Sequence, residues 1–285
     1  MAKYIIIAND TCDLPENLLK DMDVTMLPLG INIGDETLVN VPPETFYQKL
    51  REGAMPTTNA ANPNQYIELF ESALQAGEDI LCLAFSSALS ATYSSAVMAA
   101  EEMSEKYPDR KIYVVDTRAA SLGEGLLVRS ASALKKAGKT IDQVRDWVEE
   151  TKLQVSHWFI VDDLQHLKRG GRVSAAAAVM GGMLGIKPVL RVDDEGRLVP
   201  ADKARGRQAA IKRLFTQIEK AGVNLSEETV YISHADCYED AKGLGDEIKE
   251  KLGAKDVVIN YIGPVIGSHT GIGVIALFFL AAGRE

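Results

Sequence analysis

The stretch DILCLAFSSALSATYSSA, residues 79–96, joins an apolar run to a cluster of small hydroxyl side chains. Its first half is almost continuously apolar, which is typical of a β-strand that is covered on both faces. Two similar runs, YIIIAND from Tyr4 and KIYVVDT from Lys111, also end in polar residues. Amphipathic patterns typical of helices lie between and after these runs. Strands that alternate with helices predict an α/β fold with a parallel sheet and helices on both of its faces.

The pattern changes after about residue 155. Candidate strands now follow one another closely, and the segment from Asp193 to Arg197 has the composition of a hairpin turn. Two helices, near 207–221 and 238–252, interrupt these strands. The sequence predicts two domains, an α/β/α domain over residues 1–155 and an α+β domain with a largely antiparallel sheet over residues 156–285. A ligand cleft between them is the ordinary expectation for such an arrangement.

Composition excludes several classes of protein. The chain has 285 residues, a formal net charge of −9 and 46% hydrophobic residues, which predicts a soluble globular protein and argues against a general nucleic-acid binder. Its three cysteines show no spacing typical of a zinc site or of a disulfide framework. The N-terminal segment lacks the pattern of a signal peptide, so a cytoplasmic location is expected. The apolar run from Val274 is too short to cross a membrane. It predicts a core strand or helix and no stable membrane insertion.

The hydroxyl cluster after residue 85 has two interpretations. A helix is expected to begin near Thr92 or Tyr93, and Ser86, Ser87 or Ser90 could serve as its N-cap. The same helix start attracts anions through its free N–H groups and its dipole. One cap needs only one serine, and the small side chains around Ser90 would let a ligand approach the backbone. The residues alone leave both interpretations open.

The acidic residues after the first strand and the histidines are further candidates for a functional site. Asp10, Thr11 and Asp13 follow the first strand, where they could hold a metal or act in acid–base chemistry, but capping of the next helix explains Asp13 better. Among the histidines, His269 lies between glycines in YIGPVIGSHTGIGV, which would let its imidazole and the Thr270 hydroxyl approach a ligand closely. The other three histidines, His157, His166 and His234, are interpreted as structural.

Two further segments have unusual compositions. The run AAAAVMGGMLG after the basic turn KRGGR (168–172) is rich in small residues and methionine. It predicts either a tightly packed helix or the wall of an adaptable apolar cavity suited to an aliphatic ligand. The segment DKARGRQAAIKR, residues 202–213, has a net charge of +4 in an acidic chain. It is interpreted as a solvated face, as a docking surface or as a contact for phosphate.

Taken together, these motifs resemble one known family. The segments MPTTNAANP, SSALSATY, VVDT, DDLQHLKRGGRVS, GIKPVL and IGPVIGSHTGIG are similar to those of the DegV family of bacterial fatty-acid-binding proteins. They occur in the family's order over essentially the whole chain. The resemblance implies a DegV-like fold with a long-chain fatty acid between two domains, its tail in an apolar tunnel.

The resemblance also implies roles for individual residues. The family's carboxylate-binding threonine, serine and histidine match Thr58, Ser90 and His269, and three neighbouring residues are candidates for further head-group contacts: Asn59, Ala91 and Thr270. Members of this kind can act as the lipid-carrying subunit of a fatty acid kinase, presenting the carboxylate of the fatty acid to a separate ATP-using subunit that makes acyl-phosphate. On this reading the chain is not an enzyme and needs no metal or cofactor. Its candidates for partner docking are basic: Arg172, Lys203, Arg205 and Arg207.

Two departures from the family pattern bear on the head group. The family usually has serine after the binding threonine and glycine after the binding serine, where this chain has Asn59 and Ala91. Alanine disfavours a positive φ, so a tighter or reshaped pocket is expected. Two alternatives remain from the residues: a hydrolase that uses Ser90 and His269, although no GxSxG motif is present, or a ligand-independent regulatory protein that binds a partner through its basic segment.

Overall fold

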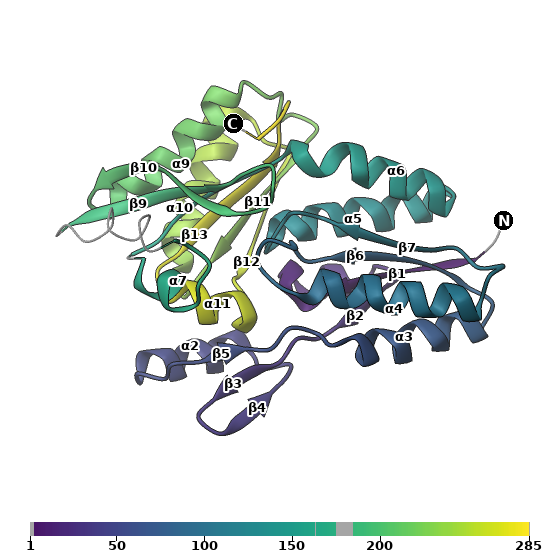
Figure 1. The fold of residues 1–285 in the computed structure, drawn as a ribbon. Helices are drawn as coiled ribbons and strands as arrows, with labels where there is room; N and C mark the ends of the chain where they lie inside the picture. The colour runs from purple at the N-terminus through teal and green to yellow at the C-terminus, as the bar shows by residue number, and fades with distance from the viewer. Residues whose placement is uncertain (1–2, 163, 175–184, 285) are drawn as a thin grey trace.

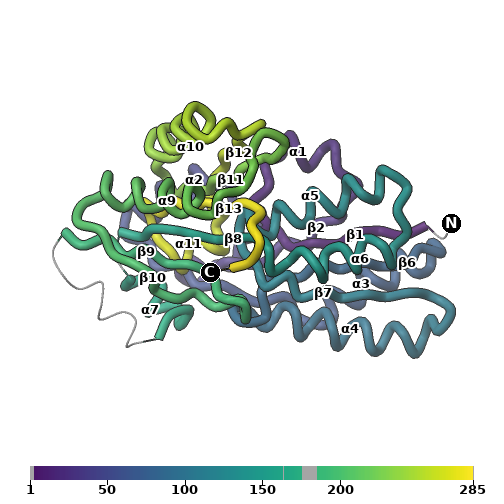
Figure 2. Tube along the Cα trace, turned by 90° about the horizontal axis from the view of Figure 1, so that it is seen from above, coloured from purple at the N-terminus to yellow at the C-terminus, as the bar shows by residue number. Residues whose placement is uncertain are grey.

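The computed structural model describes residues 3–162, 164–174 and 185–284. Two large β-sheets lie side by side, with a small third sheet beneath the junction between them (Figure 1). The N-terminus lies at the far end of the first sheet, whereas the C-terminus lies over the middle of the molecule (Figure 2). The last described residues therefore reach the region where the two large sheets meet.

The first sheet is parallel throughout and has the strand order β2–β1–β6–β7. Its strands are β1 (Tyr4–Asn9), β2 (Val24–Leu27), β6 (Asp79–Ala84) and β7 (Ile112–Asp116). All six residues of β6 are buried, because helices cover both faces of the sheet. The chain passes from β1 to β2 on one side of β1 and later to β6 on its other side. Such a reversal places a crevice at the carboxyl ends of β1 and β6.

Helices α3 and α4 pack together on one face of this sheet, and α5 and α6 cover the other face (Figure 1). Reciprocal capping boxes at Asn62 with Gln65 and at Thr140 with Gln143 start α3 and α6. The helices associated with this half are α1 (Glu16–Lys20), α2 (Pro43–Arg51), α3 (Pro63–Gln75), α4 (Thr92–Lys106), α5 (Leu122–Lys136) and α6 (Ile141–Thr151). The prediction of a parallel sheet covered on both faces is confirmed.

The small sheet has the order β4–β3–β5 and is antiparallel. It consists of β3 (Ile31–Ile33), β4 (Glu36–Leu38) and β5 (Thr57–Thr58). Strands of two or three residues leave no readable alternation, so the sequence did not predict them. Pairing of Ile31 with Thr58 fixes the position of β5.

The second large sheet has the order β10–β9–β8–β13–β11–β12. Its strands are β8 (Val155–Ile160), β9 (Ile186–Val192), β10 (Leu198–Arg205), β11 (Thr229–His234), β12 (Asp256–Tyr261) and β13 (Ile275–Leu280). Neighbours are antiparallel except β11 and β12, which a helical crossover makes parallel. The expected largely antiparallel sheet and the hairpin between β9 and β10 are confirmed, and the apolar run from Val274 is a core strand.

Helices α9 (Arg207–Ala221) and α10 (Tyr238–Leu252) pack on one face of this sheet, and α5 packs against its other face. Two short helices, α7 (Gln165–Arg169) and α11 (Pro264–Thr270), lie beside each other, next to the small sheet (Figure 1). Short 3-10 helices, η1 (Asp10–Cys12) and η2 (Lys152–Gln154), follow β1 and α6. Within the described ranges, no helix is long and apolar enough to cross a membrane.

One hydrophobic cluster includes buried residues of both large sheets, such as Ile6, Leu81 and Phe278. A second cluster lies between the second sheet and helices α9 and α10. The first cluster joins the two halves through shared apolar packing, so their relative position is fixed by a core and not only by surface contacts. The division of the chain at residue 155 into two domains stays a prediction.

Candidate functional site

A narrow cavity of about 80 Å³ lies between the two large sheets. Most of the side chains that line it are apolar and come from both halves of the chain, among them Leu29, Phe85, Leu89, Phe159, Leu167, Val192, Leu198, Ile262, Val265, Ile266, Val274, Ala276 and Phe278. Its polar lining residues are Thr58, Asn59, Ser90, Ser121, His157, Arg172, His269 and Thr270. A cavity of this kind suits a mainly apolar ligand that has a polar group.

Three side chains that were predicted to act together line this cavity: Thr58, Ser90 and His269. Thr58 lies on the short strand β5, and its Oγ1 is 2.7 Å from Nε2 of His269. Ser90 lies in the turn after β6, at the crevice between β1 and β6, and its Oγ accepts a hydrogen bond from the N–H of Thr92. A fourth residue, Arg172, lines the same cavity, and its Nε donates to the carbonyl oxygen of Leu89 at 3.1 Å.

His269 lies on a regular helix, α11, which the sequence did not predict. Burial, together with the guanidinium groups of Arg172 and Arg169, lowers the pKa of His269 to about 4. The imidazole is therefore neutral at neutral pH, and the arrival of an anion beside it would raise its pKa again.

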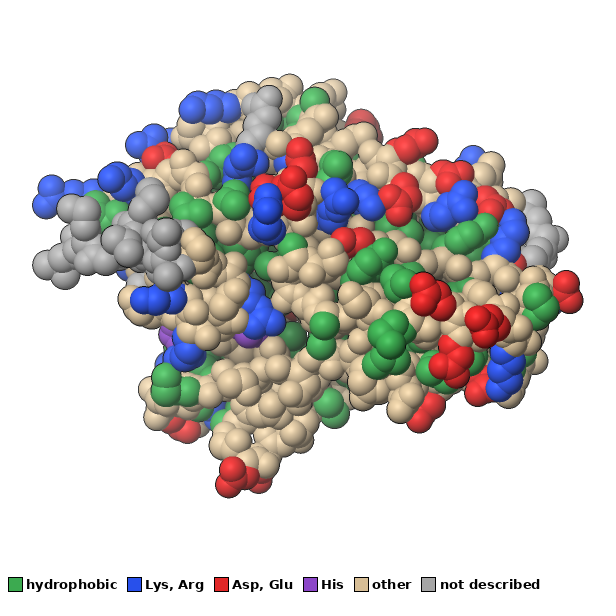
Figure 3. All heavy atoms as spheres, viewed as in Figure 1, with side chains coloured by type: hydrophobic (Ala, Val, Ile, Leu, Met, Phe, Trp, Pro, Cys, Tyr) green, Lys and Arg blue, Asp and Glu red, His purple; other side chains and the backbone are tan. Residues whose placement is uncertain are grey.

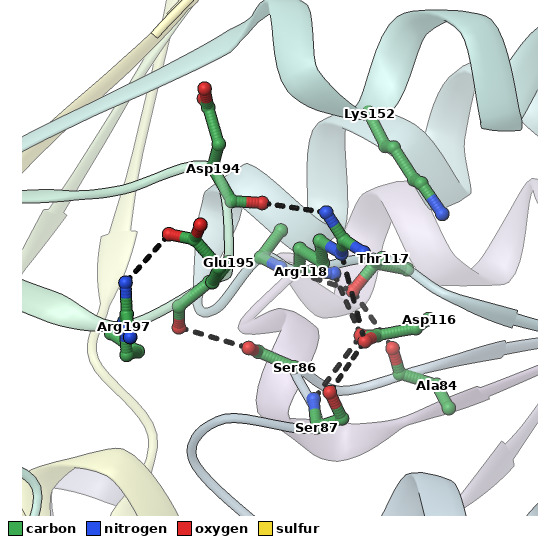
Figure 4. Close-up of polar contacts among 12 residues, drawn as sticks. Ala84, Ser86, Ser87, Asp116, Thr117, Arg118, Lys152, Asp194, Glu195 and Arg197 are labelled. Atoms are coloured by element: carbon green, nitrogen blue, oxygen red, sulfur yellow. Dashed lines mark hydrogen bonds and ion pairs between the residues drawn. The ribbon is translucent and has the colours of Figure 1, made fainter. Parts of the chain in front are cut away.

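The hydroxyl side chains of residues 86–95 have several different partners. Ser86 donates to the carbonyl oxygen of Gly196 at 2.9 Å, and Ser87 donates to the carboxylate of Asp116 at 2.6 Å (Figure 4). The Oγ1 of Thr92 accepts a hydrogen bond from the N–H of Ala61. Ser90 is the serine of this cluster that lines the cavity. Three of the hydroxyls, those of Ser86, Ser87 and Thr92, therefore bond to other segments of the chain.

The turn between β9 and β10 is held against the first sheet by side chains from outside the hairpin (Figure 4). Its carbonyl oxygens at Asp193, Asp194 and Gly196 accept hydrogen bonds from Arg284, Arg118 and Ser86, respectively. Val192 and Leu198, on the two strands beside this turn, line the cavity. The hydrogen bonds at the turn thus help to fix one wall of the cavity.

The three residues predicted as further head-group contacts lie in different environments. Asn59 and Thr270 line the cavity, but Asn59 also exchanges hydrogen bonds with Asn32, and the Thr270 hydroxyl donates to Ile266 of its own helix. Ala91 is exposed and is not among the lining residues. Its φ of −70° and ψ of −3° are accessible to any L-residue. The expected conformational cost of alanine at this position is therefore absent.

The four residues predicted to dock a partner also lie in different environments. Lys203 and Arg205 are exposed on β10, an edge strand of the second sheet. Arg207 is half-buried and forms ion pairs with Asp240 and Asp162, and Arg172 lines the cavity. On the face shown in Figure 3, Lys and Arg side chains gather at the β9–β10 end, and Asp and Glu side chains are frequent over the opposite end. The predicted AAAAVMGGMLG cavity wall lies almost entirely within 175–184, outside the described residues.

The hydrolase alternative requires a serine activated by a histidine. In the structure, Ser90 Oγ lies 2.8 Å from the hydroxyl of Thr92, whereas Nε2 of His269 is bonded to Thr58. His157 also lines the cavity, and its Nδ1 is bonded to the carbonyl oxygen of Val155. The part of the chain that the structure describes thus shows no hydrogen bond between Ser90 and His269.

The acidic residues after β1 differ from their predicted arrangement. Asp13 does not cap α1, whose N-cap position is taken by Pro15, because the Asp13 side chain instead contacts Ser121 and Gly263. No group of three or more metal-ligating side chains was found in residues 3–162, 164–174 and 185–284. Burial raises the pKa of Asp13 to about 8 and that of Asp10 to about 6. Burial also raises the pKa of Glu124 well above its ordinary value.

The raised pKa of Asp13 predicts a stability that falls as the pH rises. In the unfolded chain Asp13 ionises near pH 4, whereas in the folded protein it keeps its proton to about pH 8. The contribution of Asp13 to the free energy of unfolding is therefore fully present below about pH 4 and is lost as the pH rises to 8. Between pH 5 and 8 the loss from Asp13 alone is at most about 4 kcal/mol. Denaturant unfolding across this range should show a smaller fall in the Asp13→Asn variant. Parallel profiles for the two proteins would contradict the prediction.

Comparison with known proteins places this chain in a family. The chain matches the model of the DegV family, described as uncharacterised proteins, over residues 3–282. A DegV domain-containing protein of Clostridium perfringens is 50% identical over 290 residues, covering 100% of both chains.

Solved structures agree with this match. A structure described as fatty acid binding of a DegV family protein from Thermus thermophilus has a TM-score of 0.89 and 31% identity, and the match covers 98% of this chain and 99% of that one. The structure of DegV, a fatty acid binding protein from Bacillus subtilis, has a TM-score of 0.87 and 28% identity, with 99% and 100% covered. With the sequence match and the fold in agreement over nearly the whole chain, this protein belongs to the DegV family.

Proposed function

We propose that this protein binds a long-chain fatty acid in the cavity between its two large sheets, without chemically changing it. The observation that carries the proposal is the polar cluster of Thr58, Ser90, Arg172 and His269 in an otherwise mainly apolar cavity. The fatty acid binding described for the proteins of Thermus thermophilus and Bacillus subtilis supports it. On this proposal, residues 1–155 and 156–285 are two domains with the ligand between them.

The physical basis is a division of roles between the two parts of the ligand. A carboxylate is costly to bury unless hydrogen-bond donors or cations surround it. The hydroxyls of Thr58 and Ser90 can donate to it, and the guanidinium group of Arg172 supplies positive charge nearby. A tail of about a dozen methylenes gains roughly 10 kcal/mol of gross transfer free energy. The tail therefore sets most of the affinity, and the polar cluster sets the orientation.

The direct test is native mass spectrometry of the purified protein, followed by denaturing extraction and identification of the released molecule. A stoichiometric long-chain fatty acid would support the proposal. A protein that carries no fatty acid and takes up none when it is offered would refute it. The length of the released chain and its double bonds would then describe the preference of the cavity.

Removal of single head-group contacts should weaken binding. Ser90→Ala, Thr58→Ala and His269→Ala each remove one hydrogen-bonding group from the proposed carboxylate site. A hydrogen bond to a charged group contributes about 1.5–3 kcal/mol, so each variant should lose about tenfold or more in affinity. Titration with cis-parinaric acid, a naturally fluorescent fatty acid, measures this loss.

Neighbouring hydroxyl residues provide matched controls. Ser87 and Thr57 are exposed and do not line the cavity. Ser87→Ala and Thr57→Ala should therefore leave the affinity for cis-parinaric acid unchanged. Equal losses in the control and head-group variants would show that the assigned carboxylate contacts are wrong.

We further propose, from the resemblance to the lipid-carrying subunits of fatty acid kinases, that the loaded protein presents its carboxylate to a separate ATP-dependent kinase subunit. The exposed side chains of Lys203 and Arg205 are the candidates for docking it, since they lie on the half of the protein that carries His269. Formation of acyl-phosphate from the loaded protein, ATP and the kinase subunit encoded by the same organism tests this step. No product from a fully loaded protein would refute it.

A further inference from the structure

Asp13 connects the end of β1 to the helix that carries His269. Its Oδ1 accepts a hydrogen bond from the N–H of Gly263 at 2.9 Å, and Ser121 Oγ lies 2.5 Å from its Oδ2. The side chain of Asn260 donates to the carbonyl oxygen of Asp13 at 2.8 Å. Asp13 is only 7% exposed. Through these contacts a residue near the N-terminus is bound to two segments that lie far away in the sequence.

The contact with Gly263 lies at the start of helix α11. Gly263 is the N-cap residue of α11, and this short helix presents Val265, Ile266 and His269 to the cavity. A second contact, from the hydroxyl of Tyr47 to the carbonyl oxygen of Ile262 at 2.8 Å, fixes the preceding residue. Because α11 is a single short helix, a shift of its first turn that the rest of the helix followed would carry His269 away from Thr58.

The backbone is unusual on both sides of the contact between Asp13 and Ser121. Asp13 has a φ of 50° and Ser121 has a φ of 53°, so both partners of one hydrogen bond adopt conformations that non-glycine residues rarely occupy. Such conformations persist where the surrounding structure fixes them, and they gather at functional sites. Ser121 Oγ is also 2.7 Å from Ser233 Oγ on β11. The contact thus joins the first sheet to the second.

The hydrogen-bonded group of Asp13, Ser121 and Gly263 lies between two cavities. Ser121 lines the cavity of the proposed ligand, whereas Asp13 and Gly263 line a neighbouring, larger cleft of about 620 Å³. Leu29 and Val265 line both cavities and form part of the wall between them. The first turn of α11 therefore belongs to this wall, and Asp13 holds it in place.

We propose that Asp13 is a positioning residue for the fatty acid head group: it fixes the start of α11 and so keeps His269 opposite Thr58. This proposal rests on the proposed function of the cavity. Asp13 touches no ligand in this scheme and acts only through Gly263 and α11. Loss of the contact frees the helix, which weakens the hold on the carboxylate and shortens the time that the ligand stays bound.

Substitutions on both sides of the contact test the proposal. A Cβ atom added at Gly263 would lie 2.6 Å from Oδ1 of Asp13, while its φ of −67° suits alanine. Gly263→Ala and Asp13→Ala should each raise the dissociation rate of cis-parinaric acid about tenfold, with the same direction of change in both. Asp13→Asn keeps an acceptor for the N–H of Gly263, and its rate should stay within about twofold of the wild type. Gly243→Ala is the matched control, because it lies on α10 and the added Cβ would meet no neighbouring segment within 4 Å.

A second measurement separates positioning from general stability and needs no ligand. The ring nitrogens of His269, observed by ¹⁵N NMR in the ligand-free protein, should change their signal in Gly263→Ala and Asp13→Ala but not in Asp13→Asn or Gly243→Ala. Wild-type dissociation rates and wild-type His269 signals in the folded alanine variants would overturn the proposal. If Gly263→Ala does not fold, the pair Asp13→Ala and Asp13→Asn still decides it. A wild-type protein that binds no fatty acid would refute the proposed function, whereas the NMR signals would still report the position of His269.

Discussion

Replacing Arg284 by methionine is expected to lower the melting temperature by roughly 10 °C. The guanidinium group donates to four carbonyl oxygens: Arg118, Lys152, Val155 and Asp193. Arg284 is buried, and burial lowers its pKa to about 10. Methionine fills much of the same space but leaves these acceptors without donors, at a cost of about 3–5 kcal/mol. For a protein of this size each kcal/mol shifts the melting temperature by about 2–4 °C.

Differential scanning calorimetry measures this effect, and an exposed arginine supplies the control. Arg213 forms a surface ion pair with Asp202, with its side chain about half exposed. Arg213→Met should change the melting temperature by no more than about 2 °C, because surface ion pairs contribute little. If Arg284→Met melted within the same margin, the hydrogen bonds of Arg284 would not be holding the β9–β10 turn in place.

The second large effect concerns the length of the bound chain and depends on the proposed function. Ala276 lies on β13, where it pairs with Phe159 and Ser233 and lines the cavity. A phenylalanine ring at this position would occupy the space of about four methylenes, which is worth about 3 kcal/mol of transfer free energy. Ala276→Phe should therefore lose about 100-fold in affinity for long chains. A fatty acid that is four methylenes shorter should bind the variant with nearly the affinity that it has for the wild type. Competition against cis-parinaric acid with a series of chain lengths measures both values.

The exposed Ala209 on α9 provides a control for the added ring. Ala209→Phe adds the same bulk outside the cavity, so its profile of affinity against chain length should match the wild type. An equal loss for short and long chains in Ala276→Phe, with the protein still folded, would place the tail elsewhere in the cavity.

The large elements of this fold could be predicted from the sequence because their patterns are local. The buried run of β6 and the helical patterns beside it correspond to the observed strand and helices. The strands β3, β4 and β5 were missed because they have only two or three residues each. Helix α11 was not predicted, and within it Gly267 packs closely against Phe46 and Tyr47. That contact depends on residues far away in the sequence, which no local pattern contains.

The candidate site shows the same limit. Thr58, Ser90 and His269 could be named from the resemblance to the family, but the residues alone could not distinguish Ser90 from Ser86 or Ser87. The difference is that Ser86 and Ser87 bond to Gly196 and Asp116, which other parts of the fold bring close. Arg172 was assigned to partner docking, although it lines the cavity. Asp13 was interpreted as a helix cap because its contacts with Ser121 and Gly263 cannot be read from neighbouring residues.

The place of β13 within its sheet sets the order in which a newly made chain can assemble. β1, β2, β6 and β7 all lie within the first 116 residues, so the parallel sheet can form while the rest of the chain is being synthesised. β8 has β13 as one of its two neighbours, and Ile160 pairs with Ile275. Until β13 has left the ribosome, one edge of β8 lacks its native partner. The nascent protein therefore carries an open strand edge that is prone to aggregation, and it depends on the late arrival of β13 to close it.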